Sequence, residues 1–383
     1  MGLRSLKDFN FSYEKILITE ILRKEKIEKN GRIDWEKFLN ILISEDIYPI
    51  FYKFFLNKKE LIPESFFKIL EILYEKNKDR VLFLKERTIY ILKKLMENNI
   101  IAIPLRGFLL SERVYEDLFS RSFNDIDIFV FERDLFKAID ILKNEGFYFD
   151  LDEKRENFLK KIHFRLYNEY RLYKENFLVE IHFDILPKRF KKIKNFEKFF
   201  EFENLDLNGL KIYIFSKEWE IILLSIHSFL HKYSLLKFLF DIHKFILKFK
   251  KEIDFYKVYE ISKILHILKI VKLSLTLTNF IFETDLPSFL KFKNLPIFLK
   301  DFVLKEKEVY GFKKDLLPLI FIESFPQKIY HTLSLLNPDE NVLNFILLPE
   351  PLFFLYYPVR IFLIIKNRLF DFLFLKTLKF FCF

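Results

Sequence analysis

The spacing of apolar residues changes twice along this chain of 383 residues, and the change limits the folds open to it. Residues 1–95 carry apolar side chains at the 3.6-residue spacing of amphipathic helices, first over 35–43 and again from Glu60 to Leu95. Strand-like runs concentrate between residues 98 and 215, and helical spacing returns from Lys217 onward. The sequence therefore predicts an α+β fold, with a small mixed sheet between two helical parts.

Short apolar runs in the middle of the chain are the expected strands: 100–105, 126–131, 164–167, 177–183 and 210–215. Helical spacing separates the early runs over 109–118 and 134–144, and Gly146 is the type of residue that commonly ends a helix. No linker, low-complexity tract or internal repeat marks a boundary. The changes in spacing therefore predict an N-terminal helical part (1–95), an α/β core (96–215) and a C-terminal helical part (216–383).

Composition narrows the class of protein. Hydrophobic residues make up 51% of the chain, which argues against intrinsic disorder. The net charge of +10 suits a nucleic acid or an anionic membrane as partner, but abundant Lys with scarce Ala and Gln also fits an A+T-rich coding sequence. Few Gln, Cys and Met are typical of a thermophile. The single cysteine, Cys382, excludes an internal disulfide framework and a cysteine-based zinc site.

The two ends of the chain give expectations about membranes. The N-terminus lacks the apolar core of a signal peptide, so a cytoplasmic protein is expected. The segment Pro351–Ile365 is the nearest to a membrane span, but Pro358 and Arg360 interrupt it. The basic, Phe-rich tail after it predicts either helices packed on the domain or a peripheral contact with a membrane.

The triplet Asp125-Ile126-Asp127 opens one of the expected strands, behind a glycine turn. Residues two apart on a strand point to the same side, so both carboxylates would project from one face. Two such oxygen ligands suit Mg²⁺ carrying a triphosphate. The triplets 150–152 and 218–220 lack this context, because the first runs into a charge cluster and the second opens a helical pattern.

Two further segments supply what nucleotidyl transfer needs besides metal ligands. At Leu105-Arg106-Gly107 a strand meets a helix, so Gly107 would permit close approach of a phosphate and Arg106 would bind it. The run 177–183 places Glu180 and His182 on one strand face. Glu180 is then either a third metal-facing carboxylate that helps deprotonate an attacking hydroxyl, or an exposed residue of an amphipathic strand.

These segments, together with Tyr115, Arg121 and Gly146-Phe147-Tyr148, resemble the uncharacterised nucleotidyltransferase family of the DNA-polymerase-β-like superfamily. The resemblance extends over the helices on both sides, from about residue 30 to 250. It implies a polymerase-β-like core that transfers a nucleoside monophosphate from an NTP, with Mg²⁺ or Mn²⁺ as cofactor. The acceptor would be a small molecule, a glycan or a protein, and nucleic acid stays open.

The resemblance also implies roles for single residues: Asp125, Asp127 and Glu180 as metal ligands, Arg106, Gly107 and Arg121 at the nucleotide phosphates, and His182 and His163 on the acceptor side. Arg121 would neutralise phosphate charge or anchor its loop. The chain departs from the superfamily at Phe108, where a serine is usual, and at Arg106, where this branch usually has lysine.

Two alternatives remain at the level of the sequence. His227 and His231 stand four apart on a helix, a spacing that can bind zinc, but the absence of a glutamate between them favours helix packing or a contact behind the site. The whole chain could instead be a catalytically silent relative that serves as an interaction or nucleotide-sensing module. Three clustered carboxylates argue against that alternative, because grouping like charges is costly unless they bind something.

Overall fold

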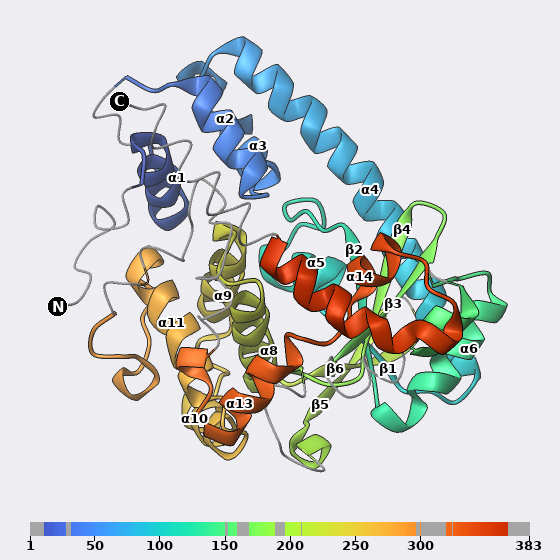
Figure 1. Ribbon diagram of the computed structural model, residues 1–383. Helices are drawn as coiled ribbons and strands as arrows, with labels where there is room; N and C mark the ends of the chain where they lie inside the picture. The colour runs from blue at the N-terminus through green and yellow to red at the C-terminus, as the bar shows by residue number, and fades with distance from the viewer. Residues whose placement is uncertain are drawn as a thin grey trace, which may run out of the picture.

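The computed structural model describes residues 11–27, 32–149, 152–158, 168–187, 196–207, 209–295, 299, 319–323 and 325–366. Within these residues, helices from both ends of the chain surround a small mixed sheet (Figure 1). The α+β class and the small mixed sheet are thus confirmed.

Four helices precede the sheet: α1 (Tyr13–Lys24), α2 (Trp35–Ser44), α3 (Tyr48–Leu56) and α4 (Glu64–Glu97). Ser12 and Asp34 start the first two, because each side chain accepts a hydrogen bond from a backbone N–H of the first turn. Extended backbone at Pro63 delays the long helix expected from Glu60 until Glu64. The helix α4 then runs from the N-terminal helices to the sheet (Figure 1).

The sheet has the strand order β1-β2-β4-β3. Its strands are β1 (Ala102–Pro104), β2 (Asp125–Val130), β3 (Glu169–Lys174) and β4 (Phe177–His182). The central pair β2 and β4 is parallel, and each outer strand is antiparallel to its neighbour. Helices α5 (Gly107–Tyr115) and α6 (Leu135–Asn144) fill the connections, while β5 (Phe202–Leu207) and β6 (Leu210–Phe215) form a separate hairpin.

The expected strands at 100–105, 126–131, 177–183 and 210–215 are confirmed with ends that differ by at most two residues. Both expected helices in this region are confirmed, and Gly146, with a φ of +86°, follows the end of α6. The expected strand at 164–167 lies outside the described residues. Two strands, β3 and β5, were not expected from the sequence.

Helices dominate after the hairpin: α8 (Lys217–Leu230), α9 (Leu236–Phe249), α10 (Phe255–Ile264), α11 (Leu268–Phe282), α13 (Phe325–Ser334), α14 (Glu340–Phe345) and a helix over 356–366. Short 3₁₀ turns are η2 (Lys59–Leu61), η3 (Glu132–Asp134), η4 (Phe196–Phe199), η5 (Ser288–Leu290) and η7 (Glu350–Leu355). Among the described helices, none is both long and apolar enough to cross a membrane.

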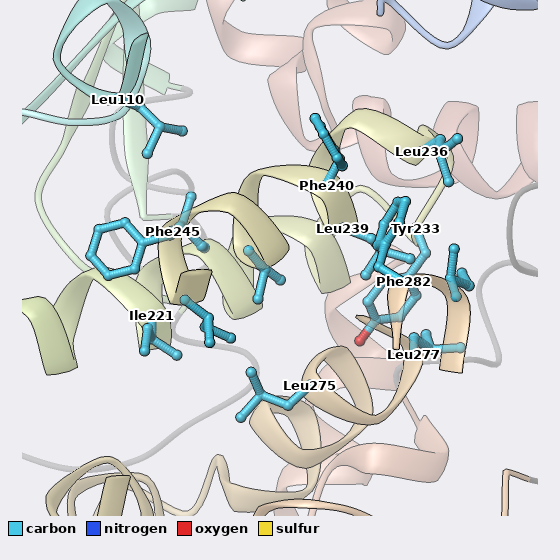
Figure 2. Close-up of a cluster of buried hydrophobic side chains, with 14 of the residues drawn as sticks. Leu110, Ile221, Tyr233, Leu236, Leu239, Phe240, Phe245, Leu275, Leu277 and Phe282 are labelled. Carbon is cyan, nitrogen blue, oxygen red and sulfur yellow. The ribbon is translucent and has the colours of Figure 1, made fainter. Parts of the chain in front are cut away.

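Two hydrophobic cores hold these elements together, and neither follows the order of the chain. One joins the N-terminal helices to α8, α9 and α11, where residues such as Tyr233, Phe240 and Phe282 interdigitate (Figure 2). The other lies under the sheet and includes the second half of α4 together with Phe353 and Tyr356. Because Tyr356 is fully buried there, the C-terminal segment is part of the core beneath the sheet.

Candidate active site

One face of the sheet is apolar and the other carries the charged residues. Ile126 and Ile128 of β2 and Val179 and Ile181 of β4 point into the core beneath the sheet. Because side chains alternate along a strand, the residues between them point the opposite way. Parallel pairing then sets Asp127 directly opposite Glu180, with Asp125 two residues earlier on the same face.

Asp127 is at the centre of this charged face. One carboxylate oxygen accepts hydrogen bonds from Arg106, at 2.8 Å from Nη2 and 3.3 Å from Nε. The other lies 2.9 Å from Nε2 of His182. Burial opposes ionisation, but the charge of Arg106 and the bond to His182 outweigh it and hold the pKa of Asp127 well below its usual range. Asp127 is therefore a carboxylate at neutral pH.

Glu180 and Asp125 show the opposite behaviour. Burial, followed by the charges of Glu169 and Asp127, raises the pKa of Glu180 to about 7. Burial and the charge of Asp127 also raise the pKa of Asp125. Two basic groups lie beside Glu180 among the described residues: Arg171 of β3, at 3.0 Å between Nε and Oε1, and His182, at 3.8 Å between Nε2 and Oε2. The cluster thus holds more negative charge than its neighbours neutralise.

The turn between β1 and α5 lies against this cluster. Arg106 adopts φ 50° and ψ −121°, and Gly107 also has a positive φ of +47°. A residue with a Cβ in such backbone carries strain of about 1–3 kcal/mol, which persists when the surroundings fix it. Here Leu105 N–H donates to the carbonyl of Asp127 at 2.9 Å, and the Arg106 side chain binds the same residue. The turn is thus tied to β2 through both backbone and side chain.

The loop that leads into β2 is anchored by buried ion pairs. Arg121, 4% exposed, binds Asp241 of α9 through contacts of 2.9 Å from Nε and 2.9 Å from Nη2. Lys237 of the same helix binds Asp46 and donates to the carbonyl of Ser122 at 3.1 Å. Of the two roles expected for Arg121, these contacts fit the anchoring of its loop.

Helices α8 and α9 form a second wall facing the charged sheet. Together the two walls enclose a cavity of about 520 Å³, within the usual range for a ligand site. His227, His231 and Phe238 line it beside apolar residues of α8, whereas Arg106, Asp125, Asp127 and Glu180 line the opposite side. His227 and His231 thus border the cavity in addition to packing between helices.

The donor set fits a divalent cation. Ligand atoms of Asp127, Glu180 and His182 all lie within 4.8 Å of one another. Carboxylate oxygens are the ligands that Mg²⁺ and Mn²⁺ prefer, and Asp125 adds a third on the same face. Burial, followed by the negative charge of neighbouring carboxylates, raises the pKa of Asp125 and of Glu180, and a bound cation would offset both effects.

Comparison with protein families agrees with this arrangement. The model of a family described as uncharacterised nucleotidyltransferase matches residues 31–283. The chain belongs to this uncharacterised nucleotidyltransferase family. The match spans the helices α2 to α4, the sheet and the helices α8 to α11, so both walls of the cavity lie within it. No curated protein and no solved structure matches the chain.

The structure of this nucleotidyltransferase family member brings most of the predicted site residues to one cavity. Asp125, Asp127, Glu180, His182, Arg106, Gly107 and Arg121 all line it. His163 lies outside the described residues. The acidic residues of the triplet 218–220 do not line the cavity. Glu220 pairs with Arg113, and Glu218 accepts a hydrogen bond from the backbone N–H of Asp254.

Several residues of the site were missed from the sequence. Asp46, Glu169, Arg171, Asp184 and Lys237 line the same cavity. Glu169 and Arg171 could have been found, because they alternate with the apolar residues Tyr170 and Leu172. Such alternation marks a strand with one apolar and one charged face. Asp46 and Lys237 carry no such signal, since only the tertiary fold brings them together.

Proposed function

We propose that this chain transfers a nucleoside monophosphate from an NTP to a hydroxyl group of an acceptor, with release of pyrophosphate. The observation that carries the proposal is the register of β2 and β4, which sets Asp127 beside Glu180, with Asp125 on the same face. Clustered carboxylates beside an anion-binding turn are what metal-dependent chemistry at phosphorus needs. Membership of a nucleotidyltransferase family supports the same reaction.

The residues divide the chemistry between them. The acceptor oxygen forms a bond to the α-phosphorus, while the bond from that phosphorus to the oxygen bridging the β-phosphate breaks. Pyrophosphate leaves with the electron pair, and the hydroxyl proton passes to the carboxylate of Glu180. Arg106 and the first N–H groups of α5 hold the phosphate oxygens during the transfer.

Asp125, Asp127 and Glu180 would hold Mg²⁺ or Mn²⁺, with His182 hydrogen-bonded to Asp127 to fix its orientation. Such a cation, when bound, supplies charge neutralisation at the triphosphate and a lower pKa for the attacking hydroxyl. The acceptor class we propose is a small molecule, a glycan or a protein that presents a hydroxyl group.

The test uses an NTP labelled at its α-phosphate and measures where the label goes. We expect the full chain, with Mg²⁺ and hydroxyl-bearing acceptors, to move α-labelled nucleotide to the acceptor and to release an equal amount of pyrophosphate. Asp127→Asn keeps the shape of the side chain but removes its charge, and should slow transfer about a hundredfold or more. Asp140→Asn is the matched control, because Asp140 is exposed on α6 and does not line the cavity.

Other outcomes would contradict the proposal in distinct ways. Transfer of a γ-phosphate label with no pyrophosphate would mean phosphoryl transfer in place of nucleotidyl transfer. NTP binding that persists in both variants, with no turnover by the wild type, would mean the silent nucleotide-sensing module. Circular dichroism of Asp127→Asn separates loss of activity from loss of fold.

A further inference from the structure

The wall of the cavity that faces the carboxylates has a different chemistry from the sheet. Helix α8 lines it with Leu223, Ile226 and Leu230, and the two histidines lie on the same stripe of the helix. Phe238 of α9 completes the surface. We call His227, His231 and Phe238 the aromatic wall.

The three rings of the aromatic wall pack on one another. The imidazole rings of His227 and His231 lie 4.4 Å apart between centroids. Phe238, only 8% exposed, meets His227 at 4.8 Å with its plane at 81°, and meets His231 at 5.0 Å. This mutual packing holds the rings in place, so they form a rigid surface for a ligand.

Both imidazoles are left without a polar partner. Among the described residues, neither ring forms a hydrogen bond or an ion pair, whereas His182 binds Asp127 and His243 binds Thr284. His231 is exposed because it borders the cavity. Desolvation inside the cleft, followed by the charge of Arg106, lowers the pKa of both rings. Each ring is therefore neutral, with one nitrogen as donor and the other as acceptor.

The position of the aromatic wall points to one part of the nucleotide. The aromatic wall lies across the cavity from Arg106, and the charge of Arg106 acts on both of its imidazole rings, so a nucleotide held at Arg106 by its phosphates would present its other end to the wall. We propose that His227, His231 and Phe238 form the subsite for the nucleobase of the NTP. This inference rests on the proposed function. A planar, uncharged ring with donors and acceptors on its edge matches such a surface, because it can stack and hydrogen-bond at once.

The experiment compares ligands that differ only in the base. Binding of ATP, GTP, CTP, UTP and inorganic tripolyphosphate is measured calorimetrically with Mg²⁺, using the full chain. Loss of a stacking ring costs about 1–3 kcal/mol, so His231→Ala and Phe238→Leu should weaken the preferred NTP about tenfold. Tripolyphosphate binding should not change, and the ratio between the best and worst NTP should shrink. Ser234→Ala is the matched control, since Ser234 is exposed near His231 but does not line the cavity.

Each other result overturns the inference. Equal weakening of NTP and tripolyphosphate would assign the aromatic wall to the phosphates. Unchanged binding and unchanged preference among the NTPs in both variants would place the base elsewhere and leave nucleotidyl transfer standing. A wild type that binds no NTP would remove the proposed function together with its subsite. Urea unfolding of each variant shows whether a change reflects the site or the fold.

Discussion

The ion pair between Arg121 and Asp241 should be the most costly charge pair to break in the loop before β2. Its two side chains are 4% and 1% exposed, so neither can be rescued by water. Among the described residues, Arg121→Met leaves the Asp241 carboxylate with the Tyr115 hydroxyl, at 2.7 Å, as its one hydrogen-bond partner. Removing one partner of a buried pair typically costs about 3–5 kcal/mol, because the other charge stays buried and unpaired. Such a loss is a large share of the stability of an ordinary domain.

The double variant Arg121→Met/Asp241→Leu separates the pair from its surroundings. It removes both charges of the pair, so its main cost is the unpaired Tyr115 hydroxyl, about 1–3 kcal/mol. We therefore expect the double variant to be more stable than either single variant, with a coupling energy of several kcal/mol. Urea unfolding followed by fluorescence measures all members of the cycle.

A matched control and a clear contrary result complete the test. Arg133→Met breaks a pair with Asp134 in which the arginine is 71% exposed, and should cost about 1 kcal/mol or less. Additive losses in the cycle, or a loss of under about 1 kcal/mol for Arg121→Met, would refute the anchoring role. If Arg121→Met stays folded, lower stability with unchanged NTP affinity would also separate anchoring from phosphate binding.

Three further predictions concern the turn, pH and the tail. Gly107→Ala should destabilise by about 1 kcal/mol, because its φ is positive while the added Cβ would meet only Phe123, at 4.0 Å; a loss above about 3 kcal/mol in urea unfolding would contradict this. Burial lowers the pKa of His243 to about 4, so the stability it contributes is complete above its unfolded pKa near 6.5 and falls as pH drops toward 4. His243→Gln should therefore lose about 2 kcal/mol less than wild type between pH 7 and pH 5, and equal losses would exclude the effect. Half of the large exposed apolar side chains in the described part of the chain lie within 320–365, next to the Phe-rich tail, so anionic liposomes should float the full chain better than a version ending at Lys366. Equal flotation would exclude a membrane contact made by the tail after Lys366.

The cut in that last experiment shows what the sequence alone would get wrong. A truncation after Leu348 looks reasonable from the sequence, since prolines and an interrupted apolar run follow it. In the structure Phe353 and Tyr356 are buried in the core beneath the sheet, and the Tyr356 hydroxyl accepts from Leu348 N–H at 3.1 Å. That truncation would damage the core as well as any membrane contact. A cut at Lys366 keeps Phe353, Tyr356 and every other core residue in the described part of the chain.

The central strands were predictable because their signal is local. In β2 and β4 apolar residues alternate with acidic ones, and burial of the apolar face leaves only one register open. The strand β5 was also within reach, since Asn208-Gly209 is the strongest short-range hairpin signal. None of its residues is fully buried, so its apolar pattern is weak, which explains why it was missed.

The cations around the site were not predictable, for a physical reason. Arg171 meets Glu180 only because β3 pairs with β4, and Lys237 meets Asp46 across 191 positions of the chain. The residues next to a lysine or arginine in the sequence do not identify a partner that lies so far along the chain. Sequence patterns specify which face of a strand is charged, whereas the fold decides which opposite charges reach it.

Those partners determine how much negative charge remains in the cavity. Its lining contains six carboxylates: Asp46, Asp125, Asp127, Glu169, Glu180 and Asp184. Lys237 forms an ion pair with Asp46. Arg121 forms an ion pair with Asp241, which does not line the cavity. Arg106 and His182 both bind Asp127, and Arg171 pairs with Glu180. Burial, followed by the charges of neighbouring carboxylates, raises the pKa of Asp125 and of Glu180 despite two nearby arginines, and a divalent cation bound among them would favour their ionised forms.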